Sequence, residues 1–150
     1  MDARAETAFV AAVEHILSRW GYTLSEGRVY AVLLLNKEPM SISAIKDATG
    51  LSRSTVSTAL SKLSRDYLVV ARVEGRNKLF SALPGFFNIF MRQPREMLER
   101  EVRPAIRLLK DSGANGEVLE EFKRLECALE EILLMGSDVT CKSPRSKGKT

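Results

Sequence analysis

The stretch LSRSTVSTALSKLSRD, residues 51–66, has seven serines and threonines among the thirteen residues from Ser52 to Ser64. Hydroxyl side chains compete with the backbone for hydrogen bonds, so this composition is a poor one for an isolated helix. The spacing of the apolar residues nevertheless predicts a helix with Ser52 as its N-cap and its end near Tyr67. At 100° per residue the apolar side chains fall on one side: Val56, Ala59, Leu60 and Leu63.

A short helix is expected immediately before this segment. Ser41 can cap its N-terminus, and Ile42 and Ile45 give it an apolar side. Gly50 ends it, because glycine readily adopts the left-handed conformation of a helix C-terminus. Two short helices joined by a three- or four-residue turn that contains glycine are typical of a helix-turn-helix.

A β-hairpin is expected directly after the second helix. LVVARV at 68–73 and KLFSA at 78–82 are rich in β-branched and aromatic residues, and EGRN between them supplies glycine and asparagine for a tight turn. This order predicts a winged helix-turn-helix whose wing carries Arg72, Arg76 and Lys78.

Helices are also expected on both sides of this core. Residues 3–19 have a helical apolar stripe, and a largely buried helix capped by Ser25 should run through the apolar residues 29–35. After residue 84 we expect one kinked or two consecutive helices, with Pro94 as a first helical residue. A final helix has coiled-coil spacing at Val118, Phe122, Leu125, Leu129 and Ile132.

The predicted fold is therefore mainly α with a small β-hairpin. The winged helix-turn-helix covers residues 22–83, a helical dimerisation region covers 3–20 and 84–135, and a disordered basic tail covers 137–150.

The charge distribution indicates a polyanionic partner. Residues 51–80 carry six basic and two acidic side chains, and the last fourteen residues carry four basic side chains and one acidic side chain. Small hydroxyls opposite the apolar side let the helix 52–66 enter a DNA major groove about 12 Å wide, and Arg76 suits a minor groove or a phosphate. The predicted DNA-binding residues are Ser41, Ser52, Arg53, Ser54, Thr55, Ser57, Thr58, Ser61, Lys62, Arg65, Arg72, Arg76, Asn77 and Lys78.

These motifs also carry a family resemblance. MSISAIKDATGLSRSTVSTALSKLSRDYLVVARVEGRNKLFSA, residues 40–82, resembles the winged-helix core of the MarR superfamily of transcriptional regulators. GYTLSEGRVYAVLLLNKEPMS before it and FMRQPREMLEREVRPAI after it are similar to the GbsR-like branch. The resemblance implies a homodimer that reads a pseudo-palindromic double-stranded site through its two winged domains. The apolar stripes of the terminal helices would form the interface: Phe9, Val13, Ile16, Val118, Phe122, Leu125, Leu129 and Ile132.

Members of that family often respond to a small-molecule effector. An aromatic cage for a quaternary ammonium compound would here draw on Trp20, Tyr22, Tyr30, Phe86, Phe87 and Phe90. Aromatic residues at helical spacing more often belong to a core, so both interpretations stay open.

An enzyme is not expected, because the chain offers no catalytic constellation. It has one histidine, His15, two cysteines far from it, Cys127 and Cys141, and no glycine-rich phosphate loop, so no metal or cofactor is expected either. The N-terminus does not have the layout of a signal peptide, and no apolar run reaches about 20 residues, so we expect a cytoplasmic protein without a membrane partner.

The leading hypothesis is a dimeric, sequence-specific transcriptional regulator, and more specifically a repressor. Two alternatives stay open. One is an architectural protein that coats DNA with little sequence preference, and the other is a winged-helix module for protein interaction.

Overall fold

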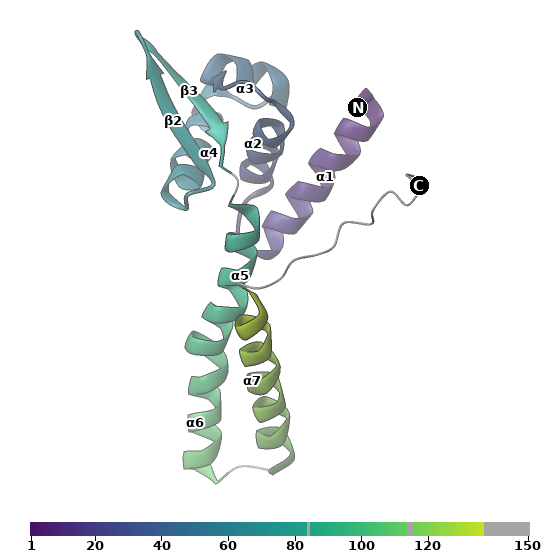
Figure 1. Cartoon of the computed structure of the whole chain (residues 1–150), viewed down its shortest axis with the longest axis vertical. Coiled ribbons are helices and arrows are strands. Elements are labelled where there is room, and N and C mark those ends of the chain that lie inside the picture. The colour runs from purple at the N-terminus through teal and green to yellow at the C-terminus, as the bar shows by residue number, and fades with distance from the viewer. Residues whose placement is uncertain (84, 114–115, 137–150) are drawn as a thin grey trace, which may run out of the picture. The chain divides into compact units, whose positions relative to one another are not determined.

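The computed structural model describes residues 1–83, 85–113 and 116–136. The chain falls into two compact units, Met1–Phe87 and Asn88–Thr150. The predicted fold class is confirmed, because the described chain is mainly helical with one small antiparallel sheet (Figure 1).

The first unit contains the predicted winged helix-turn-helix. Its elements are, in chain order, α1 (Ala3–Arg19), α2 (Leu24–Leu35), β1 (Met40–Ser41), α3 (Ile42–Thr49), α4 (Arg53–Arg65), β2 (Val69–Glu74), β3 (Asn77–Ala82) and the start of α5 (Phe86–Glu96).

Helix α2 forms the centre of this unit and packs against α1, α3, α4 and β3 (Figure 1). The side chains from Val29 to Leu33 are buried, whereas Leu34 is exposed, so the predicted burial of the apolar run 29–35 is confirmed for its first five residues. Burying an aliphatic side chain such as valine stabilises the fold by about 1.5–3 kcal/mol, so α2 is the main hydrophobic anchor of the unit.

The cap of α2 differs from the prediction. Thr23, and not Ser25, is the N-cap residue, because it forms a reciprocal capping box with Glu26. The Thr23 hydroxyl accepts the Glu26 N–H at 3.1 Å, and the Glu26 carboxylate accepts the Thr23 N–H at 2.7 Å. Ser25 lacks an acidic residue three positions later, so only Thr23 can satisfy two backbone donors in this way.

Helix α1 packs along α2 and approaches it closely at Gly27, where a Cβ atom would lie 2.8 Å from Cα of Glu14. Val13 is 4% exposed in this contact. Val13 of the predicted interface stripe is therefore buried within its own unit, where α1 packs against α2, and is not available to a second chain. Phe9 is half-buried and Ile16 stays exposed.

The helix-turn-helix begins and ends where its caps predict. The Ser41 hydroxyl accepts the Ala44 N–H, and Gly50 ends α3 with φ 74°. The Ser52 hydroxyl then accepts the Thr55 N–H at the start of α4. The inner side of α4 is buried, as predicted: Val56, Ala59, Leu60 and Leu63.

The predicted β-hairpin is present as part of a sheet with strand order β1-β3-β2. Glu74 pairs with Asn77, which leaves a two-residue turn that contains Gly75 at φ 61°. Strand β1 was not predicted, since the pairing of Met40 with Phe80 extends over only two residues and gives no periodic signal.

The second unit contains the rest of α5, a π-helical segment and two more helices. The segments that follow α5 are η1 (Met97–Val102), α6 (Arg103–Ser112) and α7 (Gly116–Gly136). Pro94 lies inside α5 and does not begin a helix, which corrects the prediction. The chain stays α-helical past this proline to Glu96 and then widens into η1, where the Arg103 N–H bonds to the Leu98 carbonyl five residues earlier.

Helix α7 packs against α6 and η1 around a small apolar core. This core comprises Leu98, Val102, Ile106 and Leu129, with Leu119, Phe122 and Leu133 packed at its edge. The guanidinium of Arg103 adds ion pairs to Glu126 at 3.4 Å and Glu130 at 3.9 Å.

The coiled-coil seam predicted on α7 is divided between two environments. Leu129 is buried and Phe122 is half-buried against the unit's own core. Val118, Leu125 and Ile132 remain exposed, with exposed fractions of 42%, 40% and 44%. Part of the seam thus packs against the core of its own unit, and the remaining residues form an exposed apolar stripe with a period of seven residues.

Some predictions fall outside the described residues, namely the disordered basic tail at 137–150 and Cys141. Within the described ranges, no helix has the length and apolar character needed to cross a membrane. The same ranges contain no cluster of three or more histidine, cysteine or acidic side chains that could hold a metal ion.

Candidate nucleic-acid interface

The outer face of α4 is built from short hydroxyl side chains. Ser54, Ser57, Thr58 and Ser61 are exposed on it, and its inner face is buried in the core. A helix with side chains this short can bring its backbone close to a flat or grooved partner. The face is flanked by the exposed arginine Arg53.

Hydrogen bonds within α4 explain why the helix tolerates this composition. At its N-terminus the Ser52 hydroxyl accepts the Thr55 N–H at 3.1 Å and donates to the Thr55 hydroxyl at 2.8 Å. One turn later the Thr58 hydroxyl donates to the Ser54 carbonyl at 2.9 Å. These hydroxyls therefore support the helix, and each oxygen keeps lone pairs that can accept from a base or an amide.

The basic side chains near this face differ in their partners. Nζ of Lys62 lies 5.0 Å from the ring centroid of Tyr22, a cation–π contact, and Arg72 is ion-paired with Glu74 at 2.9 Å. In the described part of the chain, four others have no ion-pair partner: Arg53, Arg65, Arg76 and Lys78. Unpaired exposed cations are available to a phosphate without first breaking an internal pair.

The hairpin of β2 and β3 extends away from the helices of its unit (Figure 1). Residues 70–78 are all exposed. Arg76 follows Gly75 in the tight turn, and Arg72 and Lys78 stand on the two strands. The hairpin therefore presents basic side chains at its tip and along its length, as a wing would.

A groove of about 480 Å³ separates α4 from the hairpin. Among its lining residues are three of the predicted DNA-binding residues, Ser57, Ser61 and Lys78. Ser64 and Tyr67 also line the groove, although sequence reasoning did not select them. The groove brings the helix and the hairpin together into one continuous surface.

Ser41 has a structural task in addition to any contact with DNA. It is half-buried, caps α3 and pairs with Leu79 of β3. Asn77 lies in the hairpin beside the turn, where its side chain is exposed.

The aromatic residues predicted as a ligand cage are packed in part against one another. The ring centroids of Trp20 and Phe86 are 5.3 Å apart, and those of Tyr30 and Phe86 are 6.2 Å apart. Tyr30 is fully buried, and burial raises the pKa of its phenol above the ordinary value of 10.0. Trp20, Tyr30 and Phe86 are thus a packed cluster in the first unit, as the core interpretation expects.

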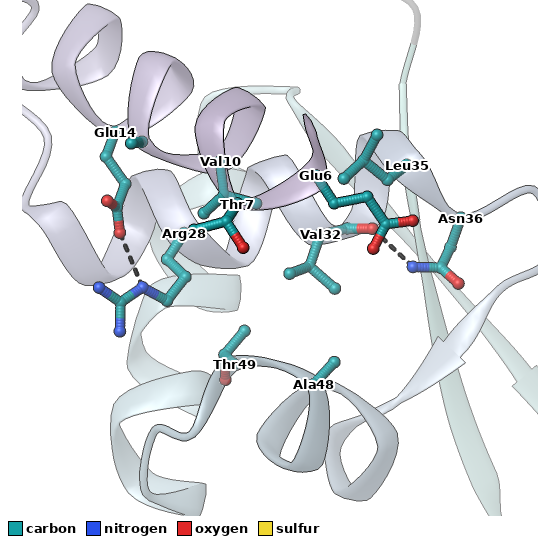
Figure 2. Close-up of a pocket in the computed structure, with 11 residues that line it drawn as sticks. Glu6, Thr7, Val10, Glu14, Arg28, Val32, Leu35, Asn36, Ala48 and Thr49 are labelled. Atoms are coloured by element: carbon teal, nitrogen blue, oxygen red, sulfur yellow. Dashed lines mark hydrogen bonds and ion pairs between the residues drawn. The ribbon is translucent and has the colours of Figure 1, made fainter. Parts of the chain in front are cut away.

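A separate hollow of about 480 Å³ lies among α1, α2 and α3 (Figure 2). Figure 2 shows Glu14 on α1 directed toward Arg28 on α2, and their Oε2 and Nε atoms are 2.7 Å apart. The wall formed by α3 includes Thr49, whose hydroxyl accepts the Leu51 N–H in the helix-turn-helix turn. The other lining residues are Glu6, Thr7, Val10, Ala11, Val32, Leu35, Asn36 and Ala48.

Comparison with known proteins supports the winged helix-turn-helix fold of the first unit. Residues 17–85 match the family model described as "Sugar-specific transcriptional regulator TrmB". A solved structure titled "Crystal Structure of a transcriptional regulator" has 19% identity and a TM-score of 0.68, and the match covers 89% of this chain and 94% of that chain. The matched family segment spans the helix-turn-helix and the β2–β3 hairpin.

A second solved structure, that of a single-residue mutant of Lactococcus lactis ZitR, has 19% identity and a TM-score of 0.38, and the match covers 73% of each chain. No curated protein sequence matches the chain. Because the family match is to TrmB, the MarR superfamily and its GbsR-like branch are not confirmed and stay a prediction.

Proposed function

We propose that the chain is a DNA-binding transcriptional regulator that places α4 in the major groove and the β2–β3 wing at the minor groove or the backbone. The observation that carries the proposal is the single surface formed by the hydroxyl face of α4, the basic hairpin and the groove between them. The family match over residues 17–85 supports the same function.

The chemistry of this surface suits a duplex. Short hydroxyls allow close approach to base edges, and four unpaired cations can attract phosphates: Arg53 and Arg65 at the two ends of α4, and Arg76 and Lys78 on the hairpin. The N–H groups in the first turn of α4, next to the capping residue Ser52, provide a further phosphate site.

The proposed active form is a homodimer. The exposed stripe of Val118, Leu125 and Ile132 on α7 supports it, because apolar side chains repeated every seven residues favour packing against a second helix. A two-fold dimer presents two copies of α4 about one DNA turn, roughly 34 Å, apart, which suits a pseudo-palindromic site. A dimer bound across a promoter would block transcription, so we propose repression as its effect.

A small-molecule effector is also part of the proposal, and the hollow in Figure 2 is the place we assign to it. The family description names sugars, and Glu6 and Asn36 line the hollow with groups that can bond to sugar hydroxyls. Thr49 connects this hollow to the helix-turn-helix turn. Thermal unfolding in the presence of a panel of mono- and disaccharides tests this assignment. If no sugar raises the unfolding midpoint, the effector is not a sugar.

Selection of bound fragments from random double-stranded DNA, followed by titration of the selected fragment across a salt series, tests the main proposal. A specific regulator should prefer its site over random DNA by roughly a thousandfold at physiological salt. Steep salt dependence without preference would instead identify an architectural DNA-coating protein, for which the weakly discriminating hydroxyl face is the supporting observation. Binding to neither DNA would point to a protein-interaction module.

A further inference from the structure

Tyr67 has an unusual backbone conformation at the end of α4. Its φ angle is 60°, and among the described residues no other non-glycine residue has a positive φ. Its N–H bonds to the Ser64 carbonyl at 3.2 Å, and the Leu68 N–H bonds to the Leu63 carbonyl at 2.9 Å. This pair of bonds defines a Schellman motif with Tyr67 at the left-handed position, where glycine or asparagine is strongly favoured.

Packing does not explain the choice of tyrosine. The side chain of Tyr67 is 74% exposed, and the apolar contact that accompanies a Schellman motif is supplied by the buried residues Leu63 and Leu68. Glycine would complete the same motif without the left-handed strain. An exposed side chain kept in a strained conformation is a feature of functional sites.

The position of Tyr67 indicates the function. It lines the groove between α4 and the hairpin together with Ser61, Ser64 and Lys78. In the proposed complex α4 occupies the major groove and the wing lies at the minor groove. The sugar-phosphate strand that separates the two grooves of a duplex must then pass between these elements, over this groove.

We propose that this groove binds one sugar-phosphate strand of the DNA and that Tyr67 contacts this strand. The phenol donates a hydrogen bond to a phosphate oxygen, and the ring packs on a deoxyribose. Ser61 and Ser64 add hydroxyl donors and Lys78 adds a charge. The rest of the described lining is Ser57 and seven apolar residues, Ile42, Leu60, Val69, Val70, Ala71, Phe80 and Leu83, with no acidic side chain among them. The apolar part suits the deoxyribose rings of the strand, and the hydroxyls and Lys78 suit its phosphates. This inference rests on the proposed function.

The decisive variant is Tyr67→Gly, since it separates stability from binding. We expect its urea midpoint to rise, because glycine relieves the left-handed strain. We expect its Kd for the selected duplex to rise about tenfold, in line with the loss of a hydrogen bond to a charged group. Tyr67→Phe retains the ring and the strain and should show an intermediate loss of affinity at unchanged midpoint.

The salt series distinguishes the groove residues from each other. Tyr67 is uncharged, so Tyr67→Gly should leave the slope of log Kd against log salt unchanged, whereas Lys78→Ala should reduce it by about one. Leu108→Ala is the matched control, because Leu108 is 71% exposed on α6 and outside the groove. It should leave both Kd and slope unchanged.

Two results would overturn the inference while leaving the proposed function intact. One is a Tyr67→Gly variant that binds the duplex as tightly as the wild-type chain. The other is a Tyr67→Gly variant that is less stable than wild type, since the tyrosine would then serve the fold. If the wild-type chain itself binds no duplex, the proposed function fails and the inference fails with it.

Discussion

The Tyr22 hydroxyl donates a 2.6 Å hydrogen bond to Oδ2 of Asp66, a residue 44 positions later in the chain. Asp66 is the C-cap residue of α4, and Tyr22 follows α1. The ring of Tyr22 also makes a cation–π contact with Lys62, whose Nζ lies 5.0 Å from the ring centroid. One tyrosine thus fixes the C-terminal end of the proposed recognition helix to the segment between α1 and α2.

We predict that Tyr22→Phe lowers the free energy of unfolding by about 1–2 kcal/mol. The substitution removes a hydrogen bond to a carboxylate and leaves the ring in place for Lys62. Urea denaturation monitored by circular dichroism measures the loss. Tyr67→Phe is the control, because it removes the hydroxyl of an exposed tyrosine and should leave the free energy unchanged. Equal stability of all three proteins would show that the Tyr22–Asp66 bond contributes nothing net.

The close approach of α1 and α2 gives a second prediction. A Cβ atom at Gly27 would lie 2.8 Å from Cα of Glu14, and a backbone atom cannot rotate away as a side chain can. Gly27→Ala should therefore push the helices apart and cost about 1–3 kcal/mol of stability, seen as a lower urea midpoint. Gly116→Ala at the start of α7, where a Cβ meets no atom within 4 Å, should be neutral or stabilising. A stable Gly27→Ala variant would mean that α1 is only loosely held.

Local signals were sufficient to predict the helix-turn-helix from the sequence. Ser41, Gly50 and Ser52 act through backbone groups only a few residues away, so their roles follow from the sequence itself. The hairpin follows from its strand composition and its turn in the same way.

Features that depend on distant residues were not predictable. Strand β1 exists because Met40 meets Phe80, and the burial of Val13 depends on where α2 lies. The positive φ of Tyr67 gave no signal either, since tyrosine is not a residue that favours a left-handed turn. Ser64 and Tyr67 were missed as groove residues, because the groove exists only where the hairpin lies beside α4.

The buried hydroxyl of Tyr30 gives a third prediction. It has no hydrogen-bond partner among the described residues, and an unsatisfied buried hydroxyl costs stability. Tyr30→Phe should therefore be about 1 kcal/mol more stable than wild type at pH 7, measured by urea denaturation.

The same variant should change the alkaline limit of stability. Burial raises the pKa of Tyr30 above 10.0 in the folded state, so above pH 10 the unfolded chain releases this proton first and wild type loses stability as pH rises. Tyr30→Phe lacks this loss, and its advantage over wild type should grow above pH 10. A constant difference from about pH 7 to about pH 11 would contradict the desolvation of this phenol.

The exposed half of the α7 seam predicts how dimerisation can be broken. Leu125→Glu places a charge in the middle of the stripe and should convert the proposed dimer to a monomer at micromolar concentration, as measured by sedimentation equilibrium. Leu134→Glu is the matched control, because Leu134 is 76% exposed and lies off this stripe. A wild-type protein that sediments as a monomer would exclude the proposed dimer, and a dimer unaffected by Leu125→Glu would place its interface elsewhere.

The last prediction separates the roles of the wing and the helix. Arg76 is an exposed cation at the hairpin turn without an ion-pair partner in the described chain, so Arg76→Ala should weaken binding to all duplexes alike and reduce the salt slope by about one. Thr58 lies on the outer face of α4 and is uncharged, so Thr58→Ala should leave the slope unchanged and alter which bases are preferred.

Repeating the fragment selection with each variant checks this division. The Arg76→Ala protein should recover the wild-type site at lower yield, and the Thr58→Ala protein should recover a changed or degenerate base at one position of each half-site. The Thr58 hydroxyl also bonds to the Ser54 carbonyl, so Thr58→Ser, which keeps that hydroxyl, is the control and should retain most of the wild-type preference. Identical losses on every site for Arg76→Ala and Thr58→Ala would mean that α4 contacts only the backbone, and the architectural alternative would then be favoured.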